Sequence, residues 1–191
     1  MDRQIPHRKI EQIVKVAASA PSAHNAQPWR FIIIDDDEVK RSLAIAMGKK
    51  FREDLEKDGI PKEQREKMVA NSVIRFSEAP VLIIPCLTMK EMELYRDERQ
   101  ESEYLMGVQS VSAAITTLLL YAYAEGLGTC WYCAPLFCKE TVREILDIPR
   151  DVEPQALITM GYLGEESSKP SRRPLDEIIH LNRWGRKSGG G

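Results

Sequence analysis

A short segment between two prolines concentrates polar side chains suited to ligand binding. It spans residues 21–29 and reads Pro-Ser-Ala-His-Asn-Ala-Gln-Pro-Trp, with a hydroxyl, an imidazole and two carboxamides at Ser22, His24, Asn25 and Gln27. Neutral donors and acceptors of this kind suit a polar heterocycle or a sugar-like chain better than a metal ion. The alternative is a well-capped loop whose polar groups bond to its own backbone.

The second candidate set consists of cysteines. Cys130-x-x-Cys133, followed by Cys138, has a spacing that occurs in metal and redox sites. Residues three apart on a strand point to opposite faces, however, and no fourth ligand is close in sequence. The pattern therefore favours buried structural thiols over a metal site or a disulfide.

Three further residues have two readings each. Trp131 and Tyr132 precede Cys133, and they either pack in the core or line a pocket. Arg75 lies on an expected helix, where a surface ion pair is favoured over contact with a ligand.

Helical and strand patterns alternate along the chain. Helical spacing or composition covers residues 7–20, 37–57, 61–78, 101–125 and 139–146, and strand-like runs cover residues 29–34, 80–87, 129–133 and 156–163. Pro85 inside the second strand suggests an edge strand or a bulge. This order predicts an α/β or α+β sandwich.

The segment 101–125 is the longest helical signal. Its apolar residues follow the helical period, and small residues such as Gly107, Ala113 and Ala114 occupy much of the remaining surface. A helix of this kind is buried on nearly every side. We expect it at the centre of the core or in a subunit interface.

Composition sets the broad class. A length of 191 residues fits one domain, and a net charge of −2 lacks the basic excess of nucleic-acid-binding proteins. No run approaches the roughly 18 apolar residues of a membrane helix, and the first residues lack the apolar core of a signal peptide. These features predict a cytoplasmic protein that binds neither nucleic acid nor membrane.

The loop carries a family resemblance. The pattern Pro-Ser-x-x-Asn-x-Gln-Pro-Trp, followed by a strand, resembles the flavin loop of the nitroreductase family. The resemblance continues through residues 104–131, Cys133–Phe137 and 161–175, and so covers nearly the whole chain. The motifs Cys-Ala-Pro-Leu-Phe and Glu-Pro-Gln-Ala-Leu-Ile are most similar to the nitroreductase-like domain of the glutamate ligase of deazaflavin-coenzyme biosynthesis.

The resemblance implies a specific fold and assembly. The fold would be α+β, a three-layer α/β/α sandwich around a mixed, mainly antiparallel sheet, with the long helix central to a homodimer interface. Residues 1–174 would form the FMN-binding domain. Residues 175–191 would form an arm that packs on the partner subunit and ends in a flexible glycine stretch.

The resemblance also assigns residues to FMN. The flavin loop would contribute Pro21, Ser22, His24, Asn25 and Gln27. Backbone at Pro135 and Leu136 would pass over the ring, with the Leu136 N–H near the reactive nitrogen because proline has none. Arg172 and Arg173 would bind the phosphate, although alone they could be a solvated charge cluster.

One family feature is missing. Members usually open with Arg-x-Ser-x-Arg, which contacts the flavin, and this sequence offers only Arg3 and Arg8 nearby. We expect weaker FMN binding than in members that have the motif.

The implied activity is an NAD(P)H:acceptor oxidoreductase. FMN would carry a hydride in ping-pong fashion to a nitroaromatic, a quinone or an unsaturated cofactor precursor, with no catalytic side chain and no metal. The chain contains no GxGxxG motif. The alternatives are a flavin- or deazaflavin-binding module with little turnover, and a flavin-fragmenting or oxidase relative on the same fold.

Overall fold

The computed structural model describes residues 4–164 and 170–187. Within these residues five strands form one sheet in the order β1-β2-β5-β3, with β4 paired to the end of β2. The strands are β1 (Trp29–Ile34), β2 (Val81–Thr88), β3 (Leu127–Tyr132), β4 (Val152–Pro154) and β5 (Leu157–Tyr162). Every described pairing is antiparallel, so the expectation of a mixed sheet is wrong.

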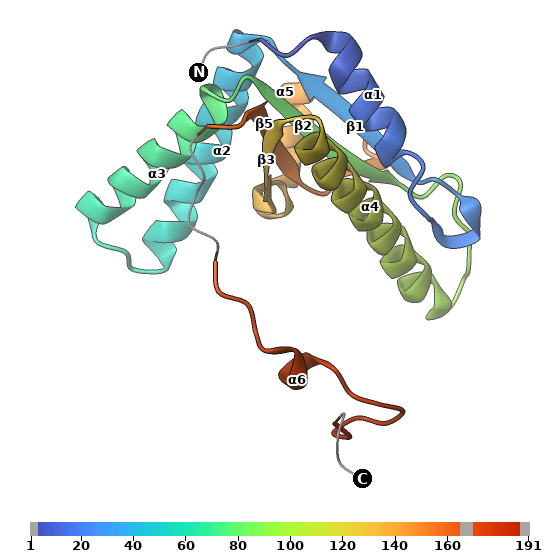
Figure 1. Ribbon diagram of the computed structural model, residues 1–191. Helices are drawn as coiled ribbons and strands as arrows, with labels where there is room; N and C mark the ends of the chain where they lie inside the picture. The colour runs from blue at the N-terminus through green and yellow to red at the C-terminus, as the bar shows by residue number, and fades with distance from the viewer. Residues whose placement is uncertain (1–3, 165–169, 188–191) are drawn as a thin grey trace.

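Helices cover both faces of this sheet (Figure 1). The covering helices are α1 (His7–Ala17), α2 (Asp37–Lys57), α3 (Lys62–Ser77), α4 (Arg99–Ala124) and α5 (Lys139–Leu146). The described residues also form the short helix α6 (Leu175–Ile178) and the single turns η1 (Ala23–Asn25) and η2 (Ala134–Phe137). Helices α1 and α4 lie on one face, and α2, α3 and α5 lie on the other. The predicted three-layer α+β sandwich is confirmed.

Strand β2 divides the core in two. Alternate side chains of a strand point to opposite faces. Val81, Ile83 and Leu87 accordingly join the cluster under α1 and α4. Leu82, Ile84 and Cys86 join the cluster under α2 and α5. A strand buried on both faces needs a continuous apolar run, which is why residues 81–87 carry no polar alternation.

Pro85 lies in the interior of the sheet, so the edge-strand alternative is wrong. The register of β2 against β5 and β4 shifts by one residue between Ile83 and Cys86, which places an extra residue opposite Pro85 as in a β-bulge. The Pro85 carbonyl accepts the Gln155 N–H at 2.9 Å. Proline has no N–H to donate, but at position 85 the bulge already interrupts the hydrogen bonds between the strands. The short strand β4 was not expected from the sequence.

Helix α4 is buried on one side only within a single chain, so it does not lie at the centre of the core, and its place in a subunit interface stays a prediction. Its sheet-facing side includes the fully buried Ile115 and Leu118. Its opposite side exposes Leu105, Leu120 and Tyr123, with exposed fractions of 55%, 69% and 67%. By length and composition alone, α4 could also cross a membrane, which was not expected from the sequence. The core helices of soluble proteins meet the same two criteria.

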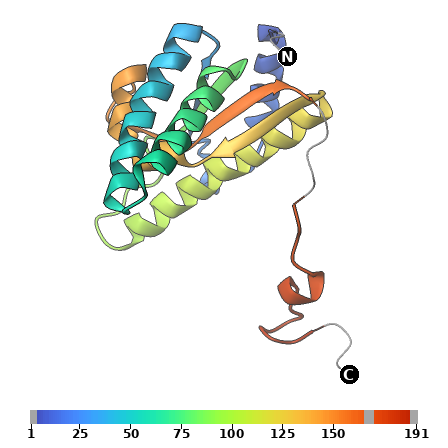
Figure 2. The ribbon, with the colours of Figure 1, turned by 90° about the vertical axis from the view of Figure 1, so that its left-hand side faces the viewer.

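The C-terminal arm extends away from the sandwich. Figures 1 and 2 show α6 and the residues after it clear of the body in both views. The arm exposes Leu175, Ile178 and Trp184, the last at 90%. The glycine-rich end expected to be flexible lies outside the described residues.

Candidate functional site

The loop before β1 has an unusual backbone. His24, Asn25 and Gln27 have φ values of 54°, 54° and 50°, in the left-handed region that non-glycine residues rarely adopt. All three side chains are exposed. Strained backbone with outward polar groups is frequent at binding sites.

Hydrogen bonds hold this conformation. The Ser22 hydroxyl accepts the Gln27 N–H at 3.1 Å, and the Ser110 hydroxyl on α4 accepts the Ala23 N–H at 3.1 Å. The Ser22 hydroxyl therefore serves the loop's own backbone, which was the alternative reading of this residue. Its proton remains available to donate to a ligand.

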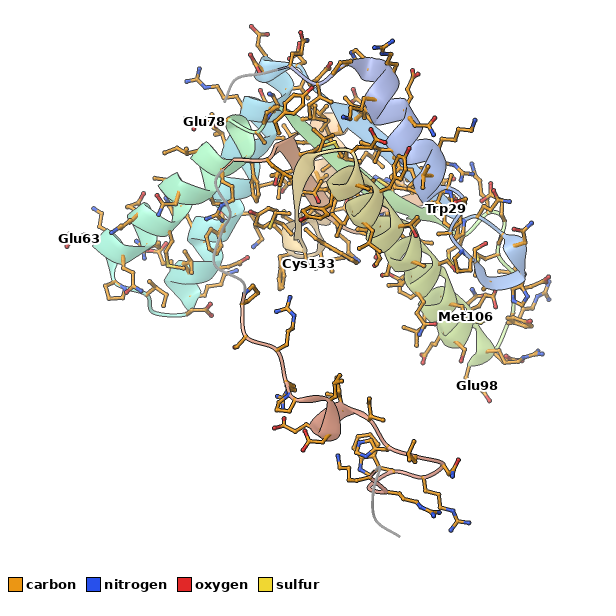
Figure 3. The ribbon with its side chains drawn as sticks, viewed as in Figure 1. Trp29, Glu63, Glu78, Glu98, Met106 and Cys133 are labelled. Carbon is orange, nitrogen blue, oxygen red and sulfur yellow. The ribbon has the colours of Figure 1, made fainter. Side chains whose placement is uncertain are left out.

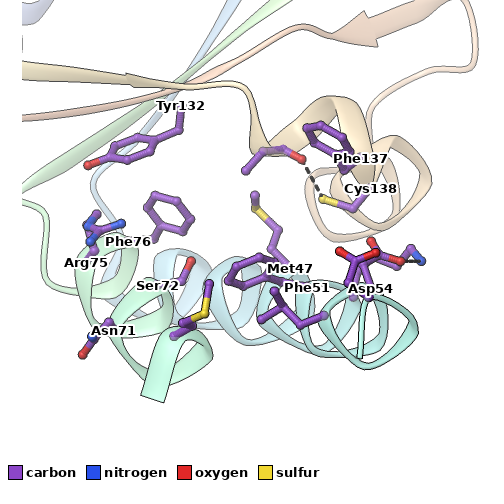
Figure 4. A pocket seen from close by; sticks show the side chains of 15 residues that line it. Met47, Phe51, Asp54, Asn71, Ser72, Arg75, Phe76, Tyr132, Phe137 and Cys138 are labelled. Carbon is purple, nitrogen blue, oxygen red and sulfur yellow. Dashed lines mark hydrogen bonds and ion pairs between the residues drawn. The ribbon is translucent and has the colours of Figure 1, made fainter. Parts of the chain in front are cut away.

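A cavity of about 520 Å³ opens on the other side of the sheet (Figure 4). It lies between α2, α3, the end of β3 and η2. Its apolar wall consists of Met47, Phe51, Leu55, Met68, Phe76, Tyr132, Ala134, Phe137 and Cys138, and its polar groups come from Lys50, Asp54, Asp58, Asn71, Ser72 and Arg75. An apolar cavity lined by a few polar groups is the usual form of a cofactor pocket.

Arg75 is the principal free cation of this cavity. Its guanidinium lies 5.6 Å from the ring centre of Tyr132. It forms no ion pair with any residue of the described ranges, so the favoured surface-ion-pair reading is wrong. Lys50, by contrast, is bound to Asp54 at 2.9 Å. Arg75 can therefore contact an electron-rich ligand atom without first breaking a salt bridge.

Tyr132 forms part of the cavity wall. Its ring meets Phe76 edge to face, with centroids 5.1 Å apart. Burial raises the pKa of Tyr132 to about 12, so the phenol stays neutral at physiological pH. The two readings of residues 131 and 132 thus divide: Tyr132 lines the pocket, and Trp131 packs against the core under α4.

The η2 turn places backbone beside the cavity. Pro135 is buried, while Leu136 and Phe137 are exposed. The Leu136 N–H, expected near the reactive nitrogen of a flavin, donates to the Cys133 carbonyl at 3.0 Å. That N–H is engaged in the turn and would have to be shared with a ligand.

The cysteines divide into two pairs. Cys86 and Cys138 are buried, and burial raises their pKa values to about 12 and about 11, which keeps both as thiols. Cys130 and Cys133 are exposed, so the expectation of buried thiols is wrong for these two. Cys130 lies on β3, which is an edge strand of the sheet, and Cys133 follows directly after this strand. No group of metal ligands gathers anywhere in the described residues.

The arginine pair lies directly before the arm. Arg172 and Arg173 are exposed, and Arg173 contacts Glu177 at 3.4 Å. Neither residue approaches the cavity or the loop within one chain. Arg8 is exposed on α1, and Arg3 lies outside the described residues.

One chain therefore keeps the predicted site residues in three separate places. Figure 3 separates Trp29, next to the loop, from Cys133, next to η2, with α4 between them. The structure adds two polar residues that sequence reasoning missed, Asn71 and Ser72. Asn71 and Arg75 lie four residues apart and therefore share one face of α3. The sequence did not reveal this pair, because most residues of α3 are charged or polar.

Comparison with known proteins identifies the family. The model of the nitroreductase family matches residues 1–162. An Archaeoglobus fulgidus protein named "Putative NADH dehydrogenase/NAD(P)H nitroreductase" is 30% identical over 96% of this chain and 90% of its own length. The chain belongs to the nitroreductase family of oxidoreductases.

Solved structures share the fold. A BluB-like flavoprotein from Clostridium difficile 630 superposes with a TM-score of 0.77 at 22% identity, over 96% of this chain and 92% of its own. An FMN-dependent nitroreductase from Clostridium difficile R20291 gives a TM-score of 0.68 at 21% identity, over 96% and 92%.

Proposed function

We propose that this protein is an FMN-dependent NAD(P)H:acceptor oxidoreductase. The observation that carries the proposal is the cavity on α3, where apolar walls adjoin the unpaired Arg75 and the amide of Asn71. The walls suit a flat tricyclic ring, and these donors suit its carbonyl edge. Bound FMN would supply two-electron transfer between NAD(P)H and an acceptor.

The protein's own residues would bind and orient the cofactor. Arg75 would donate to the pyrimidine edge, and Phe76 and Tyr132 would exclude water beside it. The exposed amides of Asn25 and Gln27 would contact the ring or the ribityl chain. Arg172 and Arg173 would reach the phosphate, which suits the planar guanidinium fork.

A second copy of the chain is needed to assemble these groups. The loop and the cavity lie apart within one chain, and α4 between them exposes an apolar stripe that includes Leu105, Leu120 and Tyr123. Exposed patches of this kind mark association surfaces. A homodimer through α4 would bring the loop of one subunit toward the cavity of the other.

The arm supports the same assembly. Leu175, Ile178 and Trp184 are exposed in the single chain and would be covered by packing on the partner subunit. This docking would also carry Arg172 and Arg173, which directly precede the arm, toward a shared site.

The acceptor is proposed from the sequence motifs. The Glu-Pro-Gln-Ala-Leu-Ile motif forms β4, the bulge and the start of β5, and Glu153 within it accepts hydrogen bonds from Lys139 and Gln155 at 2.7 and 2.8 Å. Its similarity to the deazaflavin-ligase branch favours an unsaturated cofactor precursor over a nitroaromatic or a quinone. Comparing turnover of the three acceptor classes would test this order.

The cofactor test is spectroscopic. We expect the purified protein, supplied with FMN, to show a bound flavin spectrum that bleaches when NADH or NADPH is added without oxygen. Retention of FMN without bleaching would favour a binding module. Failure to take up FMN would overturn the proposal.

The loop is tested at Asn25. Asn25→Ala should weaken FMN binding roughly tenfold and leave the dimer intact, because one amide contact is lost. Alanine also fits the positive φ poorly, so Asn25→Gly, which removes the side chain but suits the backbone, is the matched control. Titration of FMN by fluorescence quenching measures both. Wild-type affinity in the glycine variant would show that the amide makes no contact.

A further inference from the structure

Glu103 is a buried acid without a complete set of partners. It lies near the start of α4, and its side chain is 0% exposed. One oxygen, Oε1, accepts the Glu93 N–H at 2.9 Å. The other, Oε2, has no hydrogen-bond partner in the structure. A buried carboxylate costs several kcal/mol unless its charge is compensated, so this position is not explained by packing alone.

A side chain that can pair with this oxygen lies on the flavin loop, residues 21–29. His24 Nε2 lies 3.5 Å from Glu103 Oε2, and the His24 side chain is 48% exposed on its other side. The distance is that of an ion pair that needs only a small adjustment to become a hydrogen bond.

His24 is also where the loop departs from ordinary backbone geometry. Its φ of 54° interrupts the η1 turn, and Asn25 follows at the same φ. Such conformations persist only when surrounding contacts hold them. On the α4 side those contacts are Ser110, which accepts the Ala23 N–H, and Glu103, which faces the imidazole.

We infer that Glu103 is a positioning residue that holds the flavin loop in its binding conformation through its contact with His24. The inference rests on the proposed function, in that the loop presents Asn25 and Gln27 to FMN. Glu103 itself touches no ligand. It anchors two segments to α4, the loop through His24 and the connection after β2 through the Glu93 N–H.

Two substitutions at position 24 distinguish an ion pair with Glu103 from an effect of the backbone conformation alone. Asparagine adopts a positive φ more readily than lysine does. If only the backbone matters, His24→Asn binds FMN better than His24→Lys. If the ion pair matters, His24→Asn binds FMN roughly tenfold more weakly than His24→Lys does.

Glu103→Gln completes the cycle. It keeps an acceptor for the Glu93 N–H and removes the charge. We expect roughly tenfold weaker FMN binding, and no remaining advantage of lysine over asparagine at position 24 in that background. Glu101→Gln, an exposed acid on the same helix, is the control and should bind FMN as the wild type does.

Hydrogen exchange of the FMN-free protein gives a second readout. Glu103→Gln and His24→Asn should speed exchange of the Ala23 and Gln27 amides several-fold, while melting temperatures report whether the variants fold. Unchanged exchange, or His24→Asn binding FMN better than His24→Lys, would overturn the inference. If the wild type takes up no FMN, the proposed function fails, and the exchange measurement alone decides whether Glu103 holds the loop.

Discussion

Leu120→Asp should dissociate the proposed homodimer and weaken FMN binding by about 100-fold or more. Leu120 is 69% exposed on the outer side of α4, so an aspartate there is harmless in one chain. In a dimer through α4 the carboxylate would be buried without a partner, at a cost of several kcal/mol. Because each 1.4 kcal/mol is a factor of ten, both association and the shared FMN site should be lost.

Light scattering after size-exclusion chromatography measures the association state, and flavin titration measures the binding. Ile45→Asp is the matched control, since Ile45 is 52% exposed on α2 and belongs to neither the stripe nor the cavity. It should remain dimeric and bind FMN. A dimeric Leu120→Asp protein with bound FMN would show that another surface forms the dimer.

Arg75→Met should weaken FMN binding roughly 10- to 100-fold and slow NAD(P)H-dependent bleaching of any FMN still bound. A lost hydrogen bond to a charged group costs about 1.5–3 kcal/mol. No other unpaired cation among the described residues lines this cavity, because Lys50 is held by Asp54. The methionine keeps most of the packing against Tyr132.

Arg52→Met is the control for lost charge on the same helix pair. Arg52 lies on α2 and pairs with Glu66 on α3 at 3.0 Å, outside the cavity. It should bind FMN normally, and Arg75→Lys should recover part of the loss because it restores the charge. Normal FMN affinity in Arg75→Met would remove Arg75 from the cofactor site.

Much of the fold was predictable because its signals are local. The boundaries of β1, α2 and α5 match those expected from the sequence. Strand β1 is a short apolar run with a clear start and end, and α2 has the charged composition of a helix. The β4 strand was missed because three residues carry no period. The bulge opposite Pro85 depends on the register between strands distant in sequence.

The candidate site was only partly predictable. The loop was found because Ser22, Asn25 and Gln27 stand in a fixed local pattern. Arg75 was read as half of a surface ion pair, because a charged helix gives no sign of which arginine lacks a partner. Cys130 and Cys133 were expected to be buried, because a strand at the end of a sheet has the same sequence pattern as an interior one.

The sequence by itself determined the family, through its motifs, and the α+β sandwich, through the local patterns of its helices and strands. The assignment of residues 21–29 to a flavin loop stays a prediction. Only the tertiary structure decided which polar side chains have a hydrogen-bond or ion-pair partner and which do not. Partners such as Glu103 and His24, or Arg75 and Tyr132, lie far apart in sequence and meet only through packing of the helices on the sheet. The structure also decided that α4 has a bare outer face, because burial depends on neighbours in space and not on the helix's own composition.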